Sequence, residues 1–75
     1  MNVGALKGKR VECRLTQADV AKKLGTAPKT VCIKENSSIC KFSIGEIIEL
    51  IQIYHLNIKE VNLIFFDNKL PNGKL

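Results

Sequence analysis

The sequence predicts an all-α domain of five short helices, and two observations support this prediction. Three N-cap residues are each followed three positions later by an acidic residue, which is the pattern of a helix start. These pairs are Thr16 with Asp19, Ser43 with Glu46, and Asn57 with Glu60. Apolar residues also recur at helical spacing, whereas the alternation that is typical of strands is scarce.

The elements follow in order from these caps and from glycine and proline. We expect helices at about residues 3–14, 17–24, 28–36, 44–54 and 58–65. Gly4 and Gly8 weaken the first helix. Gly25 follows the second, where a left-handed residue commonly ends a helix, and Pro28 suits the first turn of the third. Residues 1–67 would form one domain and residues 68–75 a polar C-terminal tail.

The fourth predicted helix is the most apolar. Its isoleucines fall at i, i+3, i+4 and i+7 and therefore share one face; they are Ile44, Ile47, Ile48 and Ile51. Leu50 and Ile53 widen this face. We expect the helix to pack between other helices, with all of these isoleucines in the core.

The composition indicates a small globular domain. The chain has 75 residues, of which 45% are apolar and 25% are charged, as is ordinary for a globular protein. No apolar run approaches the roughly 20 residues that span a bilayer. Residues 1–10 lack the apolar centre of a signal peptide. We therefore expect a cytoplasmic protein with no membrane partner.

The residues that bind metals and catalyse reactions are few. Cys13, Cys32 and Cys40 form no C-x-x-C pair, and His55 is the only histidine. Disulfide frameworks and zinc sites usually show paired spacings, so we expect free thiols, no metal and no cofactor. We find no Ser/His/Asp set, phosphate-binding glycine loop or paired acids, so we expect neither an enzyme nor a small-molecule binder.

The positive charge is concentrated in the first half of the chain. The formal net charge is +5, and residues 1–41 carry nine basic and three acidic side chains. Residues 42–75 carry three basic and four acidic side chains. This asymmetry favours a polyanion as the partner of the first half.

Residues 16–36 give the most specific signal. Two short predicted helices meet at a tight turn around Gly25, and the small side chain of Ala21 allows them to cross closely. Val20, Leu24 and Val31 would be the packed positions. A unit of this kind presents its second helix to the major groove of DNA, which is wide enough to admit it.

The chain resembles the helix-turn-helix family of lambda-type phage repressors, Cro proteins and their Xre-like bacterial relatives. The resemblance covers about residues 5–66. It rests on Leu15-Thr16-Gln17, Val20-Ala21, Leu24-Gly25, Thr30-Val31, Glu35-Asn36, Ser43-Ile44, Ile47-Ile48 and Glu60-Val61. It implies a five-helix lambda repressor-like domain that binds double-stranded DNA in a bacterial or phage-infected cell. The function it implies is sequence-specific regulation of transcription, as in a phage or prophage repressor.

The resemblance also assigns roles to individual residues. The groove-facing positions of the third helix, which would contact bases, are Pro28, Lys29, Thr30, Cys32 and Ile33. Residues expected at DNA phosphates are Gln17 and Asn36, and the loop after the third helix would add Ser37, Ser38 and Lys41. Arg10 and Glu35 match a family ion pair that links the first and third helices.

Four positions depart from the family pattern. Ala27 stands where a capping serine is common, and His55 where a glycine is common. The family usually has an apolar residue at the position of Lys34 and a polar residue at the position of Ile33. Lys34 is then expected to lay its stem along the core and raise its ammonium to solvent.

Several alternatives stay open at the level of sequence. Lys29 would bind either a guanine edge or a phosphate, and Ile33 would either touch a thymine methyl or pack within the protein. Ser37, Ser38 and Lys41 also fit a simple polar linker, and a redox role for Cys32 has no supporting charge pattern. The rival function is a protein-interaction module, such as an antitoxin, because such proteins often use the same fold.

A homodimer is expected because one recognition helix reads only a few base pairs, too few to select a site. In the fifth helix, Ile58, Val61 and Phe65 share one face and would complete the core. The residues off that face or near its edge are Leu63, Ile64 and Phe66, which we expect to form the dimer interface. The alternative is that the short helix buries them all within one chain.

Overall fold

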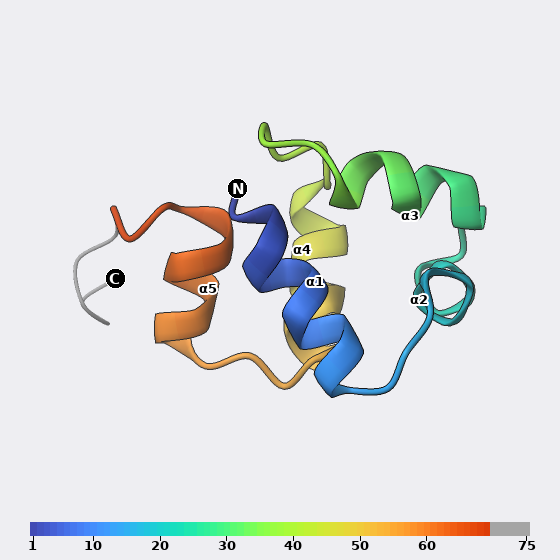
Figure 1. Cartoon of the computed structure of the whole chain (residues 1–75), viewed down its shortest axis with the longest axis horizontal. Helices are drawn as coiled ribbons and strands as arrows, with labels where there is room; N and C mark the ends of the chain where they lie inside the picture. The colour runs from blue at the N-terminus through green and yellow to red at the C-terminus, as the bar shows by residue number, and fades with distance from the viewer. Residues whose placement is uncertain (70–75) are drawn as a thin grey trace.

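Five α-helices make up the computed structural model, which describes residues 1–69 and has no strand in that range. They are α1 (Val3–Glu12), α2 (Gln17–Leu24), α3 (Pro28–Glu35), α4 (Ile44–Ile53) and α5 (Ile58–Phe65). Figure 1 shows α2 and α3 at one end of the molecule and α5 at the other, with α1 and α4 between them. The expected all-α class with five helices is confirmed. Of the expected tail, residues 68–75, all but Asn68 and Lys69 lie outside the described residues.

The helix starts follow the cap signals of the sequence. Capping boxes form at the starts of α2, α4 and α5, where Thr16, Ser43 and Asn57 each exchange hydrogen bonds with the acidic residue three positions later. At α1, the Oδ1 atom of Asn2 accepts the backbone N–H of Ala5 at 3.0 Å. The start of α3 differs, because Ala27 offers no side-chain hydrogen bond. These bonds satisfy N–H groups that have no partner within a helix.

Three helices end in the same backbone motif. A left-handed residue follows α1, α2 and α4: Arg14 at φ 58°, Gly25 at φ 71° and His55 at φ 53°. After Gly25, the N–H of Thr26 reaches back to the carbonyl of Ala21 at 2.9 Å, and equivalent bonds close the other two ends. Only glycine adopts this conformation without strain. The sequence signal was therefore clear at Gly25 and hidden at the other two ends.

One hydrophobic core connects the helices. Helix α2 packs mainly on α3, while α1 contacts both α3 and α5. The buried apolar residues come from every helix and from the segments around α4; they are Leu6, Val20, Ala21, Val31, Phe42, Leu50, Tyr54, Leu56, Val61, Ile64 and Phe65. Val20 and Val31 were expected here, and Leu24 packs against the same core while staying partly exposed.

The core is narrower than the apolar pattern of α4 and α5 suggested. Ile44 is 78% exposed and Ile48 is 51% exposed, so the expectation that all isoleucines of α4 are core is wrong. Helix α4 turns Leu50 inward and keeps Ile47 and Ile51 half-buried, while Ile44 and Ile48 stay exposed within residues 1–69. Ile58, also expected in the core, is 42% exposed at the first position of α5.

Candidate nucleic-acid interface

The unit of α2, the turn at Gly25 and α3 forms one end of the molecule. In Figure 1, α2 is seen nearly end-on while α3 runs across the view, so the two helices cross steeply. Ala21 is 1% exposed beneath this crossing, as are Val20 and Val31. The small side chain lets the helices approach, and the left-handed turn redirects the chain between them. Ala21 and the turn at Gly25 therefore determine how α3 is oriented relative to α2.

The expected base-contact residues divide into two groups on α3. The side chains of Pro28, Lys29 and Ile33 are exposed, and we call these three residues the outer face of α3. Thr30 and Cys32 are only partly exposed. Thr30 lies at the edge of this face, and the amide of Asn36 contacts the carbonyl and the sulfur of Cys32. The outer face thus combines one cation with two apolar side chains.

The first turn of α3 is chemically suited to an anion. Pro28 has no N–H, and the N–H groups of Thr30 and Val31 bond to the carbonyl of Ala27 at 3.0 and 3.3 Å. The N–H of Lys29 has no carbonyl one turn earlier to bind within the helix. Since the start of a helix carries partial positive charge, this N–H can attract an anion.

A buried polar network fixes α3 to the rest of the domain. Glu35 is 1% exposed, and its carboxylate accepts two hydrogen bonds from Arg10, at 2.9 Å from Nε and 3.2 Å from Nη2. The Nη1 atom of Arg10 donates to the carbonyl of Leu15 at 2.9 Å. Gln17 donates its Nε2 to the same carboxylate at 3.1 Å. The expected pair of Arg10 and Glu35 is therefore present in the structure, and Gln17 extends it to α2.

Three of the five expected phosphate contacts have their donors engaged inside the protein. The amide of Gln17 bonds to Glu35, that of Asn36 to the carbonyl of Cys32 at 2.8 Å, and the hydroxyl of Ser37 to the carbonyl of Ile39 at 2.6 Å. A phosphate would have to compete with these bonds. The phosphate contacts of these three residues stay a prediction, and they would require the donors to exchange their present partners for phosphate.

The other two expected phosphate contacts are better placed. The side chains of Ser38 and Lys41 are exposed, and within residues 1–69 no hydrogen bond or ion pair of theirs is formed. They lie on either side of Ile39 and Cys40 in the loop that follows α3. This loop can therefore offer a hydroxyl and an ammonium to an anion without breaking a protein contact.

Unlike the groove-facing residues of α3, Lys34 forms an ion pair within the protein. Its ammonium bonds to both carboxylate oxygens of Glu46, at 2.8 and 3.2 Å, and lies 5.9 Å from the centre of the Phe42 ring. Glu46 also accepts the N–H of Ser43 in the capping box of α4. The hydrogen bond from Lys34 is the main cause that lowers the pKa of Glu46. The ion pair thus joins α3 to the start of α4.

The basic residues of the first half are not all available to a polyanion. Lys9, Arg10 and Lys34 each form an ion pair within the protein. Six others in residues 1–41 form no ion pair within the described chain; they are Lys7, Arg14, Lys22, Lys23, Lys29 and Lys41. Lys22 and Lys23, both exposed on α2, were not among the expected contact residues. Their adjacent positions between Ala21 and Leu24, two inward-facing residues, would have been the signal to find them.

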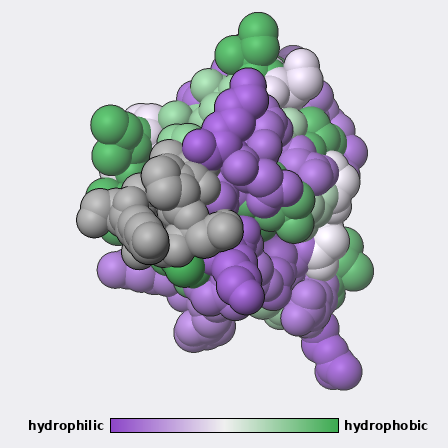
Figure 2. Space-filling view, turned by 90° about the vertical axis from the view of Figure 1, so that its left-hand side faces the viewer, coloured by the Kyte–Doolittle hydropathy of each residue, from purple (hydrophilic) through white to green (hydrophobic). Residues whose placement is uncertain are grey.

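At the α5 end of the molecule, the three residues expected to form a dimer interface differ in their exposure. Leu63 is 39% exposed and Phe66 is 41% exposed, but Ile64 is 1% exposed. The expected interface must therefore lose Ile64, which points into the core because it follows Val61 by three positions. Figure 2, which faces this end, shows a mainly hydrophilic surface interrupted by separate hydrophobic areas.

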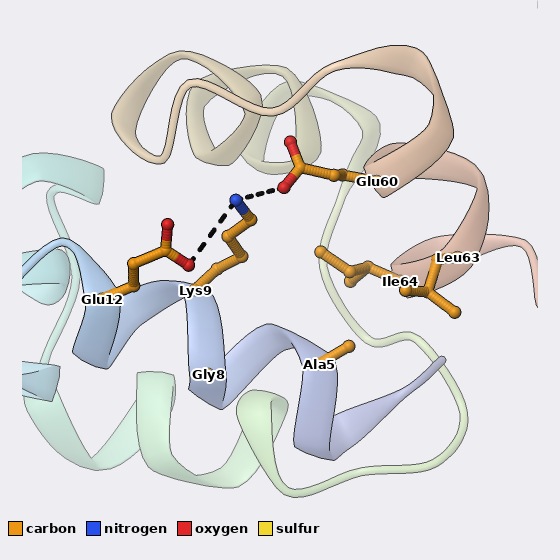
Figure 3. A pocket seen from close by; sticks show the side chains of 7 residues that line it. All are labelled: Ala5, Gly8, Lys9, Glu12, Glu60, Leu63 and Ile64. Carbon is orange, nitrogen blue, oxygen red and sulfur yellow. Dashed lines mark ion pairs between the residues drawn. The ribbon is translucent and has the colours of Figure 1, made fainter.

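A groove of about 250 Å³ separates α1 from α5. Ala5 and Gly8 line it on α1, and Leu63 and Ile64 line it on α5. Figure 3 shows Lys9 reaching across from α1 to Glu60. The hydrogen bond between them raises the pKa of Lys9 and lowers the pKa of Glu60. The groove is thus bounded by an ion pair on one side and by apolar side chains on the other.

Comparisons with known proteins provide no relative. No protein-family model matches the chain, and neither curated proteins nor solved structures give a match.

Cys13, Cys32 and Cys40 are free thiols. Residues 1–69 bring together no group of three or more side chains that could hold a metal ion. None of the helices in this range is long and apolar enough to cross a membrane.

Proposed function

We propose that this protein is a sequence-specific regulator of transcription that inserts α3 into the major groove of duplex DNA, as helix-turn-helix repressors do. The observation that carries the proposal is the anchoring of α3. Buried hydrogen bonds to Glu35 hold the helix in place, while its outer face stays exposed. A helix about 10–12 Å across fits a major groove about 12 Å wide. This function would place the protein with DNA in the cytoplasm.

The charges around α3 support binding to the DNA backbone. Lys41 in the loop after α3 is exposed and forms no ion pair within residues 1–69. Lys22 and Lys23 add two further ammonium groups on α2. Phosphate contacts fix the position of a protein on DNA, whereas contacts with base edges select the sequence. We assign Lys41 and Ser38 to phosphate and the outer face of α3 to the bases.

The protein would act as a homodimer, because one helix of eight residues reads too few base pairs to define a site. Leu63 in the last turn of α5 and Phe66, the residue that ends this helix, are both exposed. Exposed apolar side chains that cluster in this way are typical of a protein–protein interface. Leu63→Asp and Phe66→Asp should each reduce dimerisation, measured by light scattering with and without a palindromic site. A protein that stays monomeric under both conditions would contradict the dimer.

A second candidate function is an interaction with another protein, as in an antitoxin. The exposed isoleucines favour it: Ile39 is 76% exposed in the loop after α3, and Ile44 and Ile48 are exposed one turn apart on α4. Stable co-purification of a second protein, with no binding to duplex DNA, would favour this function over the first.

DNA binding is tested first with duplexes selected from a random pool. Affinity should fall with salt, with a slope of about −0.9 in log–log form for each neutralised phosphate. Lys29→Ala should weaken the preferred site by about 1–3 kcal/mol and relax selection at one base pair. Lys59→Ala serves as the matched control, since it removes the same charge from α5 at an exposed position.

Two results would contradict the proposal. One is the absence of duplex binding at low salt, and the other is an affinity that does not change with salt. If Lys29→Ala lowers the affinity for every sequence equally, Lys29 contacts phosphate, and the base assignment is wrong.

A further inference from the structure

The outer face of α3 is poor in groups that can form hydrogen bonds. Lys34 is bound to Glu46, Glu35 is buried in its network with Arg10, and the amide of Asn36 is bound to Cys32. Thr30 is only partly exposed. Among the exposed side chains of α3, Lys29 alone can donate to a base edge, and the other two, Pro28 and Ile33, are apolar.

Ile33 is the larger of these two apolar residues and is 52% exposed. It follows Lys29 by four positions, so both side chains lie on the same face of the helix. Four residues advance an α-helix by about 6 Å. Successive base pairs are about 3.4 Å apart. A helix lying along the groove would therefore bring Ile33 within about two base pairs of the base that Lys29 contacts.

The major groove offers one apolar group to such a side chain. Thymine presents its C5-methyl group there, whereas the other exposed groups at base edges are donors and acceptors. Lysine, by contrast, pairs with O6 and N7 of guanine. An isoleucine cannot satisfy a donor or an acceptor, so a favourable contact is expected only with thymine, which carries a methyl group beside its O4 acceptor.

We propose that Ile33 selects a thymine through its methyl group, within two base pairs of the guanine that Lys29 contacts. This inference rests on the proposed function, because it requires α3 to enter the major groove. It names the chemistry of the site that the protein reads: a guanine and a nearby thymine in each half-site, recognised by one ammonium and one aliphatic side chain.

The test uses uracil, which pairs as thymine does but lacks the methyl group. Each thymine of the selected site is replaced singly by deoxyuridine, and the dissociation constant is measured by fluorescence anisotropy with the whole protein. One position, within two base pairs of the guanine, should weaken binding about fourfold, which corresponds to about 0.8 kcal/mol for one buried methyl group. Ile33→Ala should lose this dependence and bind the thymine and uracil duplexes equally.

Ile44→Ala is the matched control, since it shortens an exposed isoleucine on α4 and should keep the full uracil effect. Binding that shows no uracil effect, or an effect that persists in Ile33→Ala, would overturn the inference and leave the proposed function standing. A selected site without a thymine near its guanine would do the same. Failure to bind any duplex would instead overturn the proposed function. If Ile33→Ala folds poorly, Ile33→Val takes its place, and it should reduce the uracil effect because its side chain is one methylene shorter; an unchanged effect would overturn the inference.

Discussion

The two ends of the molecule are held by different forces. At the α2–α3 end, directional hydrogen bonds converge on the buried Glu35 from Arg10 and Gln17. At the α5 end, Ile64 and Phe65 pack into the core, and the ion pair of Lys9 and Glu60 lies near the surface. A buried charged network loses much of its energy to desolvation but permits one geometry, whereas apolar packing stabilises without fixing direction as strictly. The end proposed to read DNA is therefore the end whose helices are fixed in one orientation by hydrogen bonds.

The largest expected effect is the loss of the buried carboxylate. Glu35→Ala should lower the free energy of unfolding by about 3–5 kcal/mol, because it leaves Arg10 as a buried charge without its partner. Urea unfolding followed by circular dichroism measures this change. Glu49→Ala, at an exposed glutamate on α4, is the control and should change little.

The double variant Arg10→Met with Glu35→Leu sharpens the same point. Replacing a buried ion pair by apolar residues is often neutral or stabilising, so it should regain most of the lost stability. If α3 needs the network for its orientation, the affinity for DNA should stay low although stability returns. Full recovery of both properties would show that packing alone orients α3.

At the other end, Ile64→Ala should cost about 2–5 kcal/mol of unfolding free energy, because it removes a fully buried side chain. Leu63→Ala, at the neighbouring position, should cost much less, since its side chain is 39% exposed. Denaturant unfolding of the two variants, compared at the same low concentration, checks this contrast. Equal costs would mean that Leu63 is buried too, for example in a dimer.

A smaller effect is expected where α3 meets α4. The hydrogen bond from Lys34 lowers the pKa of Glu46 below its ordinary value of 4.5. The stability from this pair is therefore present above about pH 4.5 and is lost as the pH falls through the lowered pKa of the folded state. Lys34→Met should reduce stability at pH 7 by less than about 1 kcal/mol, as for a pair near the surface. The difference from the unaltered protein should shrink in acid, and a difference that is the same at pH 7 and pH 3 would contradict this assignment.

The smallest effect concerns the helix ends. His55 adopts a left-handed conformation at φ 53°, which costs a residue with a side chain about 1 kcal/mol. His55→Gly should relieve this strain and raise the melting temperature by a few degrees. Gly25→Ala is the opposite change: no atom within 4 Å would meet the added methyl group, so any loss of stability comes from φ 71° alone. A higher melting temperature for Gly25→Ala would contradict the assigned cost of the left-handed conformation.

The sequence by itself determined the number of helices, their order and most of their ends. The starts at Thr16, Ser43 and Asn57, and the end at Gly25, depend on bonds between residues three to five positions apart. Such local bonds do not require knowledge of the fold. The pairing of Arg10 with Glu35 came instead from a family resemblance, since 25 positions separate these two residues.

Only the tertiary structure decided which apolar residues are buried and which polar groups remain available. The sequence placed Ile44 and Ile48 in the core and Ile64 at an interface, and the structure reverses these assignments. A helix with apolar residues on most of its circumference can turn several faces inward, and the neighbouring helices choose among them. The donor of Gln17 was likewise committed by Glu35, which folding brings within hydrogen-bond distance from 18 positions away. Burial and hydrogen-bond partners depend on how the helices pack together, and no local pattern in the chain specifies that packing.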